Sequence, residues 1–220
     1  MTKYYGMTQF TSITLTLLMS TDSSYFTSIQ LIYKNFLSTL IITLFLGMTR
    51  PAKQMCRYLN NSNLLDLENH LVYWGTMIIY GAGLIGSYVY FTNSGDFVPN
   101  TEHKTIKFPD GWYGETQSST VNFITSIIVF ALLPLAIYRS SPWKLPIWTN
   151  LPVTIVVIGN ILLILPISFF TSNLGFLGLK PVGRSEISVM WLIMLGTSVI
   201  VILMNNALEK YFFNKMKDSL

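Results

Sequence analysis

Six long apolar runs follow one another along this 220-residue chain, and they constrain its fold more than any other feature. A helix needs about 20 mainly apolar residues to cross a hydrocarbon core of roughly 30 Å. Backbone groups in lipid must be paired within their own segment, which favours helices over open sheets. The sequence therefore predicts an all-α integral membrane protein, a single six-helix transmembrane bundle over residues 1–220. The predicted spans are residues 4–20, 26–47, 70–91, 121–138, 151–170 and 187–208.

The low content of charged residues agrees with this interpretation. Only 11% of the residues are charged, whereas a soluble domain carries about 25%. The six spans use most of the chain, so no separate soluble domain of ordinary size is expected. The surroundings that we expect are a lipid bilayer and other membrane-protein chains, and the net charge of +4 does not indicate nucleic-acid binding.

The distribution of lysine and arginine predicts the orientation. An even number of spans places both termini on the same side, and the side richer in basic residues is expected to be cytoplasmic. The two predicted sides carry nine and four basic residues. The nine are Lys3, Arg50, Lys53, Arg57, Arg139, Lys144, Lys210, Lys215 and Lys217, and the four are Lys104, Lys107, Lys180 and Arg184.

Cysteine and histidine are too scarce to suggest a disulfide, a metal site or a bound cofactor. Cys56 is the single cysteine, and His70 and His103 are far apart in sequence. Structural zinc sites need clusters of such residues at short spacings. His103 lies in the longest loop, residues 92–119, which we interpret as a solvated loop on the outer side. We expect no metal and no cofactor.

Three stretches, in order, resemble the membrane region of type-V P-type ATPases, the branch that moves polyamines and related cations. The resemblance covers the whole chain as helices five to ten of such a pump. The first stretch resembles the end of the fifth helix, the second resembles the sixth helix and its exit, and the third resembles the loop between helices eight and nine. They are Tyr5-Gly-Met-Thr-Gln9-Phe10; Ile29-Gln30-Leu-Ile-Tyr-Lys-Asn35-Phe with Gly47-Met-Thr-Arg-Pro51-Ala-Lys53; and Tyr138-Arg-Ser-Ser-Pro142-Trp-Lys144-Leu-Pro146-Ile-Trp-Thr149-Asn150.

The sequence lacks the parts with which such pumps use ATP. No Asp-Lys-Thr-Gly-Thr, Thr-Gly-Glu-Ser or Gly-Asp-Gly motif occurs in it. Phosphoryl transfer depends on positioned charges and Mg²⁺. We therefore expect no ATP binding and no catalytic residue on this chain, which would be no enzyme on its own. Whether it takes part in an ATP-driven activity together with a chain that carries those parts stays open.

The resemblance points to a vestigial cation pathway, for which the candidate residues are Tyr5, Gln9, Gln30, Lys34 and Asn35. The family's acidic positions in the sixth helix are Ser28 and Asn35 here, and Lys34 is the only charge within a predicted span. Polar side chains on membrane helices also serve as hydrogen-bond contacts between helices. Lys34 has two interpretations: it snorkels to the outer interface, or it pairs with an acid of another chain.

Two functions remain for this non-catalytic membrane module. It is a structural or accessory subunit of a larger membrane complex, or it is the C-terminal half of a split or truncated ATP-driven polyamine or cation transporter. A stand-alone channel has less support, because no charged pathway is visible in the spans. The resemblance implies an endolysosomal or vacuolar membrane, and the sequence leaves the mitochondrial inner membrane open.

Overall fold

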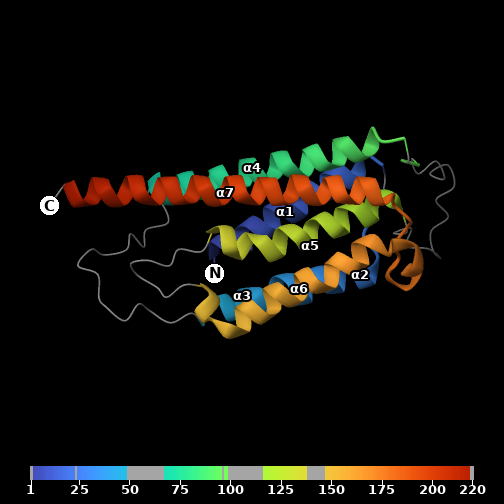
Figure 1. Cartoon of the computed structure of the whole chain (residues 1–220), viewed down its shortest axis with the longest axis horizontal. Helices are drawn as coiled ribbons and strands as arrows, with labels where there is room; N and C mark the ends of the chain where they lie inside the picture. Colours follow the sequence, from blue (N-terminus) through green and yellow to red (C-terminus); the bar gives the residue numbers. More distant parts are fainter. Residues whose placement is uncertain are drawn as a thin grey trace.

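The computed structural model describes residues 2–22, 24–48, 67–95, 97–98, 116–137 and 147–218, and every secondary-structure element within them is a helix. Six helical segments lie along one bundle (Figure 1). Each predicted span coincides with one of them, so the all-helical membrane fold is confirmed. They are α1 (Thr2–Ser20), the continuous α2 (Ser28–Ile32), η1 (Tyr33–Leu40) and α3 (Ile41–Leu46), α4 (Leu67–Thr92), α5 (Gln117–Ile137), α6 (Leu151–Phe169) and α7 (Arg184–Asp218).

Four of these segments are long and apolar enough to cross a membrane. The helices α1 and α4 fall short of that composition, since threonines interrupt α1 and glycines and tyrosines dilute α4. Six crossings therefore stay a prediction, as does the side on which the termini lie. Both chain ends lie toward the same end of the bundle in Figure 1. The four segments are Ser28–Leu46, Gln117–Ile137, Leu151–Phe169 and Arg184–Phe212.

The helix α5 is the centre of the bundle. In its most apolar stretch, 83% of the residues are buried, whereas the share is 28–33% in the other three candidate spans. Figure 1 shows it between α1, α4 and α7 on one side and α6 with α2 and α3 on the other. Most of its residues between 118 and 136 are buried where it contacts the surrounding helices.

Two glycines allow α4 and α7 to pack closely. A Cβ on Gly75 would lie 2.8 Å from the sulfur of Met204, and one on Gly83 would lie 2.9 Å from Cγ2 of Thr197. Small residues permit such approach between membrane helices. Gly81 instead faces Phe10 of α1, while a Cβ on Gly86 would meet nothing within 4 Å. Three of the four glycines of this helix are thus used inside the bundle.

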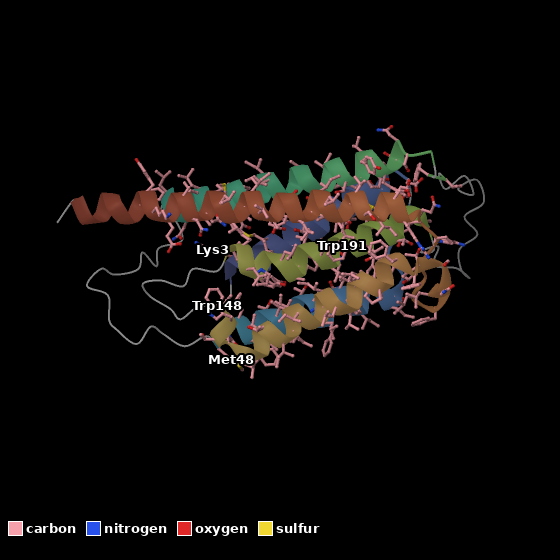
Figure 2. The ribbon with its side chains drawn as sticks, in the orientation of Figure 1. Lys3, Met48, Trp148 and Trp191 are labelled. Carbon is pink, nitrogen blue, oxygen red and sulfur yellow. The ribbon has the colours of Figure 1, made fainter. Side chains whose placement is uncertain are left out.

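Several sequence-based predictions fall on segments outside the described residues. These are residues 49–66, 99–115 and 138–146, which hold Cys56, His103, seven of the thirteen basic residues used for orientation, the end of the second family-like stretch and most of the third. Just beyond the last of these segments, Trp148 is 70% exposed, as expected for an aromatic residue at a membrane interface. Figure 2 shows Trp148, Lys3 and Met48 toward the same end of the bundle, the end where the chain begins.

Candidate functional site

The second span is π-helical in its middle, over η1. The N–H of Ile41 donates to the carbonyl of Phe36, five residues earlier, and the Thr39 hydroxyl donates to the Lys34 carbonyl at 3.1 Å. Most π-helical turns are short and many occur at functional sites. Three polar residues of this segment are buried, namely Lys34, Ser38 and Thr39, and the wider turn brings Thr39 onto the same face as Lys34, five residues before it.

Tyr4 connects η1 to α1 and α5 in the interior of the bundle. Its hydroxyl lies 2.8 Å from the carbonyl oxygen of Ser38 and 3.2 Å from that of Phe130, and its side chain is completely buried. The Phe130 carbonyl would normally accept the N–H of residue 134, but Pro134 has none. Tyr4 therefore supplies a donor where the α5 backbone lacks one.

Asn160 of α6 completes the polar interior. Its Oδ1 accepts hydrogen bonds from the Ser38 hydroxyl at 3.2 Å and the Tyr33 hydroxyl at 3.3 Å, and its Nδ2 donates to the Val156 carbonyl at 3.0 Å. The Tyr33 ring also packs edge-on against Phe123, with centroids 5.7 Å apart. Together with the contacts of Tyr4, these hydrogen bonds join α1, η1, α5 and α6 near the middle of the second span.

Lys34 brings a positive charge to the same region. Its side chain is only 4% exposed, and its ammonium group lies 3.4 Å from the Ser12 hydroxyl and 4.6 Å from the centre of the Phe26 ring. Cation–π contacts of this kind stabilise a desolvated ammonium in part. No carboxylate lies within salt-bridge distance of Lys34 among the residues that the structure describes.

Gln30 is held entirely by contacts within the chain. Its Oε1 accepts from the Ser119 hydroxyl at 2.8 Å and from the Thr27 N–H at 3.1 Å, while its Nε2 donates to the Gly178 carbonyl at 3.2 Å. The side chain is fully buried. These contacts support the interpretation of Gln30 as a connection between helices.

The start of α5 collects further polar contacts at this end of the bundle, opposite the N-terminus. Asp22 Oδ2 accepts from the Ser118 hydroxyl at 2.7 Å, and Thr120 Oγ1 accepts from the Lys180 N–H at 2.8 Å. A carboxylate near a helix N-terminus is favoured by the partial positive charge there. We refer to the polar residues that tie this end together as the outer clamp: Asp22, Gln30, Ser118, Ser119 and Thr120.

Tyr5, Gln9 and Asn35 lie on the surface instead. Tyr5 is 53% exposed, and Gln9 and Asn35 also belong to the exposed residues. Their side chains make no hydrogen bond within the described part of the chain. The five candidate pathway residues therefore divide into two buried ones, Gln30 and Lys34, and three exposed ones, and they do not form one enclosed site.

Sequence reasoning missed Tyr4, Ser38 and Asn160. Two signals were present: Pro134 leaves the Phe130 carbonyl without its helical partner, and Asn160 is the one amide within the apolar run 151–170. What the sequence does not reveal is that the tyrosine beside Tyr5 supplies the missing donor. Oxygen atoms make most of the polar contacts of this interior, and these contacts join neighbouring helices.

The comparison with protein families decides what this membrane bundle is related to. The family described as "Cation transporting ATPase, C-terminus" matches residues 23–212. The chain belongs to this family. It is thus an integral membrane protein that corresponds to the membrane part of a cation-transporting ATPase. No match was found among curated proteins. The residues that the structure describes contain no group of three or more His, Cys, Asp or Glu side chains able to hold a metal ion.

Proposed function

We propose that this chain is a non-catalytic accessory subunit of a larger membrane complex, derived from the transport half of a P-type ATPase. The observation that carries the proposal is Lys34. In the interior of the second span, the charge is positive, and the neighbouring groups are the Ser12 hydroxyl and the Phe26 ring. A cation passing this point would meet repulsion in a region of low dielectric constant.

The neutral interior supports the same proposal. Tyr4, Ser38 and Asn160 use their polar atoms to hold α1, η1, α5 and α6 to one another. Groups committed to such contacts strengthen a bundle, whereas a transport site must exchange partners during each cycle. The proposal also includes an origin in the type-V branch, which moves polyamines, and a location in an endolysosomal or vacuolar membrane. The three family-like stretches support both.

A second function is favoured by the family match and by the exposed residues. In the C-terminal half of a split polyamine or cation transporter, Tyr5, Gln9 and Asn35 would face helices of the chain that holds the ATP-driven parts. Their exposure in the isolated chain agrees with that arrangement. Lys34 counts against it, unless a partner neutralises the charge.

Native purification separates the two functions. The chain, extracted from its own membrane in mild detergent, should migrate in a complex larger than one chain, and labelled ATP should give no acyl-phosphate on it. Spermine titrated into the purified chain should give no measurable heat of binding. Spermine binding by this chain, or an acyl-phosphate on it, would refute the accessory role; an acyl-phosphate on a co-purified chain would favour the split transporter.

The topology is tested separately. Tags at the two termini should be accessible from the same side of the membrane, because nine of the thirteen basic residues outside the spans lie on the predicted terminal side. Labelling of single cysteines introduced into residues 92–119 should come from the opposite side. Labelling of those cysteines from the terminal side would overturn the orientation.

A further inference from the structure

The exposed surface of α1 is divided into a polar half and an apolar half. Residues separated by three or four positions share one face of a helix. Tyr5, Gln9, Ser12 and Thr16 follow that spacing; Ser12 is partly exposed and the other three are exposed. Ile13 and Leu17, which are 60% and 63% exposed, belong to the other half. A helix surrounded only by lipid would have no reason to segregate its residues in this way.

The two halves border different helices. The apolar half lies toward α4, since Phe10 contacts Gly81 there. The polar half lies toward the second span, because the Ser12 hydroxyl accepts the hydrogen bond from Lys34. The polar residues of α1 therefore follow the boundary between α1 and η1.

Asn35 continues the polar surface across that boundary. Its neighbours in sequence fix its direction: Tyr33 reaches Asn160 of α6, and Lys34 reaches Ser12 of α1. Two residues along a helix, α or π, turn through roughly half a circle, so Asn35 lies opposite Tyr33 and away from α6. We call the surface formed by Tyr5, Gln9, Ser12, Thr16 and Asn35 the polar face.

We propose that the polar face binds one transmembrane helix of another polypeptide, which carries a carboxylate at the depth of Ser12 and polar side chains above and below it. This partner deepens the proposed accessory role and rests on it. Charge complementarity identifies the carboxylate, since the Lys34 ammonium lies directly behind Ser12 and has a hydroxyl and an aromatic ring as its contacts. The amides of Gln9 and Asn35 need polar partners that lipid does not offer.

The position of Lys34 fits a contact at the edge of the bundle. Its buried stem places the charged end beside a residue that is itself partly exposed. A carboxylate that meets Ser12 is close enough to neutralise the ammonium, directly or through the hydroxyl. Snorkelling and pairing are therefore compatible: the side chain leans toward Phe26 and Ser12, and the partner covers that point.

Site-specific photocrosslinking in the native membrane tests the proposal. A photoreactive phenylalanine analogue at Gln9 or at Asn35 should crosslink to one and the same transmembrane segment of another chain, with an Asp or Glu within a turn of the crosslinked residue. The same analogue at Leu17, on the apolar half of α1 and 63% exposed, is the matched control and should miss that segment. Crosslinks to lipid alone, to a second copy of this chain, or to a helix without a carboxylate would overturn the proposal.

Charge variants give the second measurement. Lys34→Met should lower the crosslinking yield from Gln9 at least about tenfold, since it leaves a buried carboxylate alone, and Lys34→Arg should retain most of it. Lys34→Glu should lose the crosslink and regain it when the partner's acid is changed to lysine. Equal yields for Lys34→Met and the unchanged chain would refute the ion pair.

Native migration separates the two levels of inference. If the chain sits in a larger complex but crosslinks only from Leu17, the accessory role stands and the polar face is not its docking site. If the chain migrates alone in every mild detergent and no crosslink forms, both the accessory role and the docking site fail.

Discussion

The outer clamp and the polar face contain similar side chains, but only the outer clamp is completed by the chain itself. Gln30 and Asn35 lie on the same span, five positions apart. Gln30 is buried and makes three hydrogen bonds, whereas Asn35 is exposed and makes none among the described residues. The same chemical group thus holds the bundle together at one position and faces outward at the other. Residue type alone does not distinguish these uses; the partner does.

The tyrosine pair repeats the comparison on α1. Tyr4 is fully buried and donates to backbone carbonyls of two other helices, while Tyr5 is 53% exposed. Adjacent helical residues point about 100° apart, so one tyrosine belongs to the interior and the other to the polar face. These neighbouring pairs provide matched controls for the predictions that follow.

The largest effect on stability is expected for Gln30→Leu. The change leaves the Thr27 N–H, the Ser119 hydroxyl and the Gly178 carbonyl without their shared partner, which should lower the free energy of unfolding by about 3 kcal/mol. Reversible unfolding of the purified chain in mixed micelles measures it. Gln9→Leu, at an exposed amide, should change the same quantity by less than about 0.5 kcal/mol. Equal losses for both variants would remove the distinction between clamp and face.

Tyr4→Phe should have the next largest effect. It removes one hydroxyl and leaves the carbonyls of Ser38 and Phe130 without that donor, at a cost of about 1–3 kcal/mol. Tyr5→Phe removes the same atom from an exposed side chain and should be nearly neutral in the isolated chain. If Tyr4→Phe is as harmless as Tyr5→Phe, the hydroxyl does not connect η1 with α5 as described.

A smaller effect is expected at the loop that supports Gln30. Gly178 has a φ of +67°, and a Cβ there would overlap the Thr27 side chain. Gly178→Ala should cost about 1–2 kcal/mol from the left-handed backbone, with more if Thr27 cannot move. Gly175→Ala, where a Cβ would meet nothing within 4 Å, is the control. Thermal unfolding of the two variants should differ, and identical transitions would contradict the close contact at Thr27.

Much of the fold could be predicted because apolar runs mark membrane helices directly. The fifth predicted span, 151–170, corresponds to Leu151–Phe169, with Asn150 as its N-cap and Phe170 just beyond its end. The last helix continues to Asp218, past the predicted end at residue 208, and its additional C-terminal part is polar. Polar residues are harmless to a helix once it has left the hydrocarbon region.

The interior of the site could not be predicted in the same way. Nothing in Tyr33–Leu40 indicates the π-helical turns, which bring Thr39, five residues after Lys34, to the inward face beside Lys34 and Ser38. A π-helix changes the direction of every later side chain by a fraction of a turn. Likewise, the contact of Gln30 with Gly178 joins residues 148 positions apart, a pairing that spacing along one helix does not reveal.

The most direct test compares the two amides of the second span in one preparation. For Gln30→Leu and Asn35→Leu, the free energy of unfolding of the isolated chain and the fraction of chain assembled in its native membrane complex are measured together. Gln30→Leu should lower the unfolding free energy, while Asn35→Leu should leave it unchanged and lower the assembled fraction. The account is contradicted if Asn35→Leu assembles normally, or if it destabilises the isolated chain as much as Gln30→Leu does.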